Sequence, residues 1–276
     1  MLLPPYLFKS KAVRALKGNW QTALLVSFVA SLPFTLVQLL QVRLPDWTSL
    51  TTLEAAAAAV NAVPTSTWYM LYGASLLNVL LLPVLSVGCD RYFLCRVRGE
   101  ELGFGGLFSR FSSYGKCLWL YVNMYVRVLL WSLLLFVPGV IAAMRYAMAP
   151  YYLAENPELT AREALEKSKE TMNGLKMSFF VLELSFIGWS IASMIVQLLL
   201  YDVNVILALV VSQFVSLFIA AYMNGACAAF YHVVSAQGGV GSAQAEFNDW
   251  MRRNAQGGAW RGRDEDDDTH GDPDGQ

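Results

Sequence analysis

The chain has 276 residues, of which 56% are hydrophobic and 15% charged, and its net charge is −1. An average soluble protein has about 25% charged residues, and here the few charges gather in short clusters between long apolar stretches. This pattern is typical of a membrane protein. We therefore predict an all-α, polytopic transmembrane helical bundle with interfacial amphipathic helices and no soluble catalytic domain.

The N-terminal segment, residues 1–21, is predicted to contain a basic amphipathic helix over residues 8–19. Such a helix lies on a membrane surface, with its cations beside anionic headgroups. Basic residues before an apolar run are also typical of a signal peptide, but Pro33 interrupts this run and no small-x-small cleavage site follows. We expect an uncleaved first span. The cations of the helix are Lys9, Lys11, Arg14 and Lys17.

The membrane domain is predicted over residues 22–236. Between the second and third spans, the basic loop of residues 90–116 carries large apolar side chains at helical spacing, which predicts a short interfacial helix. Those side chains are Phe104, Leu107, Phe108 and Phe111. The expected spans are residues 22–40, 68–89, 118–136, 140–154, 177–200 and 205–234.

The segment of residues 140–154 is ambiguous because it is short and contains Arg145, whereas about 20 residues normally cross a bilayer. If it crosses, there are six spans, both termini are cytoplasmic, and 17 Lys and Arg residues lie inside with only Arg43 outside. If it does not cross, there are five spans, with nine such residues inside and ten outside. The positive-inside rule favours six spans, and five remain the alternative.

A cytoplasmic surface helix is predicted over residues 161–173. Thr160 and Glu163 form a capping-box pattern at its start, and Gly174 suits the position after its end. We expect its apolar side to face lipid or the bundle and its basic side to face headgroups or solvent. The apolar side carries Leu165 and Met172, and the basic side carries Lys167 and Lys169.

The last segment, residues 237–276, is polar, glycine-rich and acidic, with an unbroken acidic run over residues 264–268. We expect a disordered, solvated cytoplasmic tail. The four cysteines show no metal-ligand spacing and are expected to be reduced. They are Cys89, Cys95, Cys117 and Cys227.

Catalytic motifs are missing from the sequence: it has no GxSxG, HExxH or Walker A pattern. We therefore predict no catalytic residues, no metal site and no cofactor. Small residues recur every four positions in the last predicted span, which lets helices approach closely. They pack either within the chain or in a homodimer. These residues are Ala221, Gly225 and Ala229.

A candidate intramembrane polar layer emerges when each span is counted inward from its cytoplasmic end at about 1.5 Å per residue. Charges in the hydrocarbon normally pair inside the bundle, so we predict that Glu183 pairs with Arg127 or Arg145. The second arginine then either reaches the interface or holds an anionic lipid headgroup or substrate. The layer consists of Asn78, Arg127, Arg145, Glu183 and Asn224.

One block of the sequence, VPGVIAAMRYAMAPYYLAENPELTAREALEKSKETMNG followed by LELSFIGW, lies between Val137 and Trp189. It closely resembles an uncharacterised bacterial integral membrane family filed as domain of unknown function 975. RALKGNW, from Arg14 to Trp20, is also similar to the start of that family, and the resemblance covers most of residues 8–235. The block also resembles the membrane domain attached to some glycerophosphodiester phosphodiesterases, but this sequence holds no phosphodiesterase domain.

The resemblance implies a multi-pass protein of the bacterial inner membrane and brings no established activity. We expect a non-enzymatic scaffold, regulator or envelope-homeostasis factor. The alternatives are a small transporter or lipid-handling protein with a polar intramembrane site and, less favoured, an intramembrane enzyme. The expected partners are the lipid bilayer, including anionic lipid, and a second copy or another membrane protein; no nucleic acid is expected.

Overall fold

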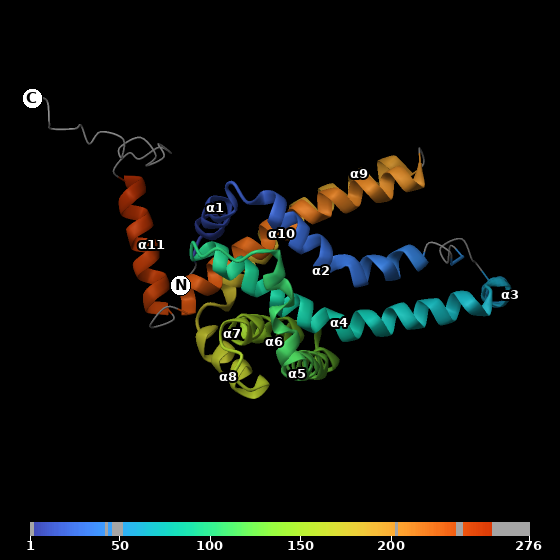
Figure 1. Ribbon diagram of the computed structural model, residues 1–276, viewed down its shortest axis with the longest axis horizontal. Coiled ribbons are helices and arrows are strands. Elements are labelled where there is room, and N and C mark those ends of the chain that lie inside the picture. The colour runs from blue at the N-terminus through green and yellow to red at the C-terminus, as the bar shows by residue number, and fades with distance from the viewer. Residues whose placement is uncertain (1–2, 42–43, 46–51, 202–203, 236–239, 256–276) are drawn as a thin grey trace, which may run out of the picture.

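The computed structural model describes residues 3–41, 44–45, 52–201, 204–235 and 240–255, and its regular structure in these ranges is helical (Figure 1). In chain order the elements are α1 (Pro5–Leu16), α2 (Trp20–Gln41), α3 (Leu53–Ala62), α4 (Thr65–Val97), the 3-10 helix η2 (Phe104–Ser113), α5 (Tyr114–Leu134), α6 (Phe136–Tyr146), α7 (Ala149–Glu155), α8 (Ala161–Thr171), α9 (Lys176–Tyr201), α10 (Val205–Ser235) and α11 (Val240–Ala255).

Five segments within the described ranges are long and apolar enough to cross a membrane, as a multi-pass protein requires. The predicted fourth span is not among them. Residues 140–154 are divided between α6, which has 11 residues, and α7, which has 7, with a turn at residues 147–148. The five candidates are Trp20–Gln41, Thr65–Val97, Phe104–Leu134, Lys176–Leu200 and Val210–Ser235.

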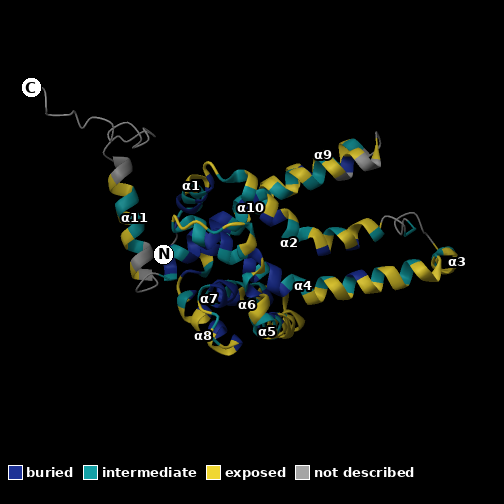
Figure 2. Ribbon diagram, in the orientation of Figure 1, coloured by how far each residue is buried: buried dark blue, intermediate teal, exposed yellow. Residues whose placement is uncertain are grey.

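The core lies at one end of the molecule, which we call the packed end: α1, η2, α7, α8 and the C-terminal halves of α4 and α10. Large aromatic side chains such as Phe8, Tyr92 and Phe230 are fully buried there. Helices α2, α4 and α9 project away from it, and Figure 2 shows that their far portions are mostly exposed. The exposed side chains include Leu76 and Leu199, which suits surfaces that lipid would cover.

Helices α5 and α6 form a hairpin that returns the chain to the packed end. Leu135 breaks the helix with extended backbone angles, so the reversal precedes Pro138 and Gly139, which lie inside α6. The two helices approach closely, because a Cβ on Gly139 would lie 2.1 Å from the Oγ of Ser132. In Figure 1, α5 is seen nearly end-on whereas α4 runs across the page, so the hairpin lies at a steep angle to α4.

The short helices predicted from the sequence are present. Helix α8 begins with a complete capping box between Thr160 and Glu163, and Gly174 beyond its end has φ +80°. Leu165 and Met172 are buried against the bundle, whereas the basic side of α8 is exposed. The predicted interfacial helix is η2, and it packs so closely on α4 that a Cβ on Gly88 would lie 1.9 Å from the carbonyl oxygen of Leu107.

The N- and C-terminal segments differ from the predictions. Helix α1 buries Phe8 and Ala12 in the core, so it packs against protein rather than lying free on a lipid surface. Part of the predicted disordered tail forms helix α11 instead. Trp250 of α11 packs edge-on against Tyr6, with ring centroids 4.6 Å apart, and Lys11 Nζ lies 2.7 Å from Glu246 Oε1. The acidic run of residues 264–268 lies outside the described residues.

Candidate functional site

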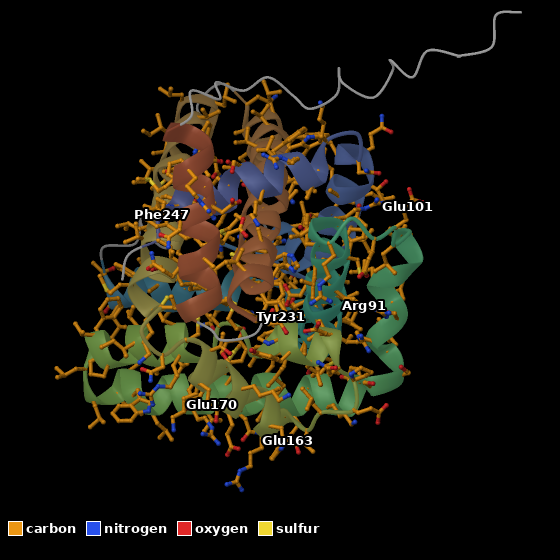
Figure 3. The ribbon with its side chains drawn as sticks, turned by 90° about the vertical axis from the view of Figure 1, so that its left-hand side faces the viewer. Arg91, Glu101, Glu163, Glu170, Tyr231 and Phe247 are labelled. Atoms are coloured by element: carbon orange, nitrogen blue, oxygen red, sulfur yellow. The ribbon has the colours of Figure 1, made fainter. Side chains whose placement is uncertain are left out.

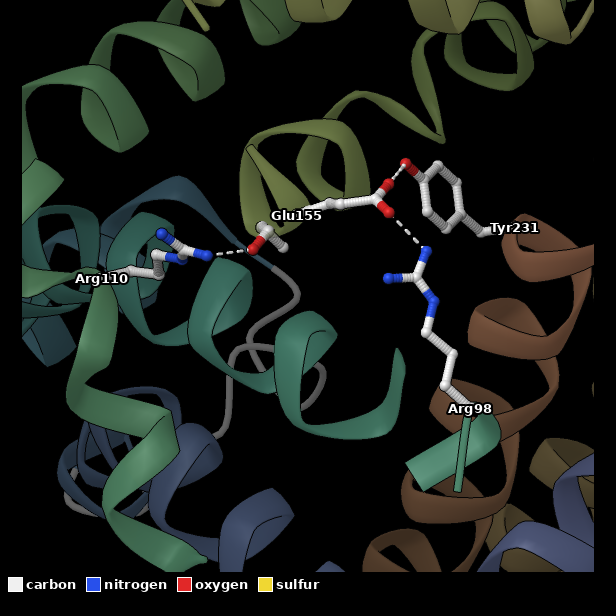
Figure 4. Close-up of polar contacts among 5 residues, drawn as sticks. Arg98, Arg110, Glu155 and Tyr231 are labelled. Carbon is white, nitrogen blue, oxygen red and sulfur yellow. Dashed lines mark hydrogen bonds and ion pairs between the residues drawn. The ribbon is translucent and has the colours of Figure 1, made fainter. Parts of the chain in front are cut away.

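A polar junction at the end of α7 joins three helices of the packed end (Figure 4). Glu155 closes α7, and its two carboxylate oxygens have different partners. Arg98, which caps α4, donates from Nη2 to Oε1 at 2.5 Å, and Tyr231 of α10 donates from its hydroxyl to Oε2 at 2.6 Å. Figure 3 views the molecule from the packed end and places Tyr231 near its middle. The junction therefore ties α7 to α4 and α10 together.

Two further cations hold the backbone beside Glu155. Arg110 of η2 is buried and donates from Nη2 to the carbonyl oxygen of Ala154. Lys116 of α5 donates from Nζ to the carbonyl oxygens of Pro157, at 2.7 Å, and Glu158, at 3.3 Å. Carbonyl groups at the end of a helix lack intrahelical partners and carry partial negative charge. The cations therefore stabilise the end of α7 and the turn that leads into α8.

The electrostatics of Glu155 favour its charged form. Burial acts to raise the pKa of this carboxyl group, but the hydrogen bonds from Tyr231 and Arg98, together with the charge of Arg98, outweigh burial and lower the pKa below its ordinary value. Glu155 and Arg98 are each about a quarter exposed, at 29% and 26%. The junction is thus a charged, hydrogen-bonded joint near the surface of the packed end, with both carboxylate oxygens occupied.

The predicted polar layer does not form one network. Glu183 of α9 accepts a hydrogen bond from the Sγ of Cys227 at 3.2 Å, and within the described residues it forms no ion pair with Arg127 or Arg145. Asn224 lies nearby, with its Nδ2 3.7 Å from the Sγ of Cys89. Glu183 and Asn224 therefore belong to one group, where α9, α10 and α4 meet.

The other three predicted residues lie elsewhere. Asn78 is half-buried in α4, and its Oδ1 is buried without a hydrogen-bond partner in the described structure. Arg127 of α5 stacks over the ring of Tyr146 in α6, at 5.8 Å from the centroid. Arg145 is tied to α8 through its backbone, because its carbonyl oxygen accepts from the Oγ of Ser168 at 2.9 Å. The two arginines are therefore associated with α6 and α8 and not with Glu183.

The small residues of the last span lie against the N-terminal helix. A Cβ on Gly225 would lie 3.3 Å from the Cβ of Ala12 and 3.4 Å from the Cδ1 of Leu16. Ala221 and Ala229, one helical turn to either side, are completely buried. The structure thus fills this side of α10 with α1.

Sequence reasoning missed two acidic residues. Asp90 was assigned to a loop, but it lies inside α4, half-buried, and interacts with the side chain of Tyr151 in α7. The available signal was the lack of any helix breaker between Asp90 and Gly99. Glu155 directly follows the predicted span of residues 140–154 and was given no role. The signal available was its position, because a carboxylate between an apolar run and Asn-Pro lies at a helix end, where it can bind a neighbouring cation.

In the described ranges, no group of three or more His, Cys, Asp and Glu side chains is placed to hold a metal ion. All four cysteines are free thiols, and three of them are buried. The contacts of the polar junction hold α4, α7 and α10 in one arrangement.

Comparison with curated proteins and with solved structures gives no match for this chain. A family model described as "Protein of unknown function (DUF975)" matches residues 132–238. This stretch runs from the end of α5 through α10 and contains both Glu155 and Tyr231, whereas their partner Arg98 precedes it. Residues 132–238 are thus similar to the DUF975 family of proteins of unknown function, and the match leaves out the first half of the membrane domain.

Proposed function

We propose that the protein is a non-enzymatic scaffold or regulator of the bacterial cytoplasmic membrane, which displays the packed end to the cytoplasm. The observation that carries the proposal is the polar junction, in which both oxygens of Glu155 are bound by Arg98 and Tyr231. A carboxylate committed in this way fixes helices relative to one another and offers no free group for catalysis or transport. A helical surface held in one arrangement is suited to binding a protein partner.

The proposed topology has both termini and α8 in the cytoplasm. The α5–α6 hairpin leaves the packed end and returns to it, because Lys116 at the start of α5 binds the Pro157 carbonyl group beyond α7. Chain segments before and after the hairpin are therefore on the same side, whether α6 and α7 cross the bilayer together or the hairpin enters it only partly. This supports the arrangement with 17 Lys and Arg residues inside and Arg43 outside.

The exposed side of α8 is the proposed partner surface. It carries alternating charges and lies at the periphery of the packed end, where Figure 3 places Glu163 and Glu170. Its buried side holds Leu165 and Ser168, both nearly or completely inaccessible. Because the two sides are separate, exposed charges of α8 can be changed without disturbing the core.

The alternative is a lipid-handling protein, and it is favoured by a small cavity beside α8 whose lining includes the basic residues Arg127, Arg162 and Lys169. A reconstitution experiment separates the two functions. Purified protein is placed in vesicles that contain a fluorescent phosphatidylglycerol analogue, and movement of the analogue between leaflets is followed. The scaffold proposal expects the rate of protein-free vesicles, whereas a rate well above that background favours lipid handling.

A second experiment tests the partner surface. An aromatic azide side chain is introduced at position 167, and the proteins that it cross-links in native membranes are compared between the otherwise wild-type sequence and a Glu170→Lys variant. We expect a defined cross-linked species with the wild-type sequence that the charge-reversed variant loses, at unchanged membrane yield. The same cross-links in both proteins would refute α8 as the partner surface.

A further inference from the structure

A basic notch lies between α5, α6 and α8, apart from the polar junction. Its volume is about 90 Å³, which is room for a few atoms and not for a whole lipid or metabolite. Two helices of the hairpin form one wall, and one side of α8 forms the other. The lining residues are Arg127, Tyr146, Arg162, Leu165, Glu166 and Lys169.

The notch has more positive than negative charge. Its three cations face one carboxylate, that of Glu166, and the Nε of Arg162 already binds this carboxylate at 3.2 Å. Arg127 and Lys169 form no ion pair within the described residues. A site with two uncompensated cations attracts an anion, and most strongly one that carries several acceptor oxygens.

The surroundings of Arg127 identify the kind of anion. Arg127 lies in a candidate membrane span, and the residues three, four and seven positions further along α5 are exposed and apolar. Residues at these spacings share one side of a helix. The notch therefore adjoins an apolar surface on one side and the charged, water-facing helix α8 on the other. The apolar residues are Leu130, Trp131 and Leu134.

We propose that the basic notch binds the phosphate group of an anionic phospholipid. Arg127 and Lys169 contact the phosphate, and the acyl chains lie along the apolar side of α5. The ring of Tyr146 holds the Arg127 guanidinium group in place by stacking against it. A soluble phosphate compound would leave that apolar side uncovered, which is why the lipid is favoured over free phosphate. This lipid site goes beyond the proposed scaffold role, because binding a lipid in the notch requires neither a protein partner nor movement of lipid across the membrane.

Native mass spectrometry of the full-length protein in detergent tests the proposal, with phosphatidylglycerol and phosphatidylcholine as competing probes. We expect wild-type protein to retain phosphatidylglycerol preferentially, and Arg127→Gln and Lys169→Gln each to lower its apparent affinity roughly tenfold, the effect of losing one charge-assisted contact. Lys167→Gln is the matched control, because Lys167 lies on the exposed side of α8 outside the notch. This variant should retain phosphatidylglycerol as the wild-type protein does.

Two further arms make the result decisive. Arg127→Lys keeps the charge and should retain most of the binding, which separates loss of the site from loss of the fold. Millimolar inorganic phosphate should not displace the lipid; displacement would assign the notch to free phosphate and overturn the lipid proposal. Equal retention of both lipids, or unchanged phosphatidylglycerol binding by Arg127→Gln and Lys169→Gln, would overturn it as well.

Discussion

Glu155 and Tyr231 are 76 positions apart in the sequence, yet the Tyr231 hydroxyl donates a 2.6 Å hydrogen bond to the Glu155 carboxylate. With Arg98 on the other oxygen, this contact joins the end of the α5–α6–α7 excursion to the last long helix. The packed end is therefore closed by a joint whose members come from three separate parts of the chain.

The joint makes a stability prediction. Glu155→Gln removes the ion pair with Arg98 and leaves a partly buried guanidinium group without its charged partner, so we expect a loss of about 1–2 kcal/mol in the free energy of unfolding. Thermal unfolding in detergent measures it. Glu170→Gln, at an exposed position of α8, is the control and should change stability by less than about 0.5 kcal/mol. Equal effects of the two substitutions would show that the joint adds nothing.

The joint also predicts an acid limit to stability. The pKa of Glu155 is lower in the folded protein than its ordinary value of 4.5, so protons bind more tightly to the unfolded chain. The contribution of Glu155 is therefore fully present above about pH 4.5 and is lost as the pH falls from there through the lower folded-state pKa. The unfolding temperature of wild-type protein should fall more steeply over this range than that of Glu155→Gln, and parallel curves would contradict the assignment.

Close packing of η2 on α4 is tested at Gly88. A Cβ atom at this position would lie 1.9 Å from the carbonyl oxygen of Leu107. Because that oxygen belongs to the backbone, a change of side-chain rotamer cannot relieve the clash. We expect Gly88→Ala to destabilise the protein by roughly 2 kcal/mol or more. Gly73, in the same helix, has open space around it, so Gly73→Ala should be neutral or stabilising by up to ~1 kcal/mol. Equal unfolding temperatures would refute the close contact.

The topology is tested by single cysteines in a cysteine-free background. Lys167→Cys places a thiol on the exposed side of α8, and Glu54→Cys places one on exposed α3 at the opposite end of the α2–α4 pair. A membrane-impermeant maleimide should label Glu54→Cys in spheroplasts but Lys167→Cys only after permeabilisation. Labelling of Lys167→Cys in intact spheroplasts would place α8 outside and exclude the proposed topology.

The sequence predicts where α8 begins and ends, but it does not predict which helices lie side by side. The α8 capping box and the positive φ of Gly174 depend on neighbouring residues, and the sequence predicted both. The polar layer was predicted from depth alone. Depth does not say which way a helix turns its side chains or which helix lies beside it, so Arg127 and Glu183 were placed together although α5 runs at a steep angle to the other long helices.

The predicted end of the second span and the predicted start of the disordered tail were wrong for a related reason. A charged residue after an apolar run was taken as the end of a span, but α4 continues through Asp90 to Val97 because protein, and not lipid, surrounds its last turns. The polar composition after residue 237 was read as disorder, whereas α11 is ordered by contacts with Tyr6 and Lys11 at the other end of the chain. Such long-range partners leave no local trace in the sequence.

The pairing of α1 with α10 has a consequence for biosynthesis. Helix α1 ends at Leu16 but buries its apolar side against a helix that ends at Ser235, so about 200 residues must be made before that contact is complete. At about 5–20 residues per second, this takes roughly 10–40 s. During that interval Phe8 lacks the ring of Phe230, its partner in α10. We therefore expect α1, which is basic and amphipathic, to lie on the lipid surface until α10 has been made.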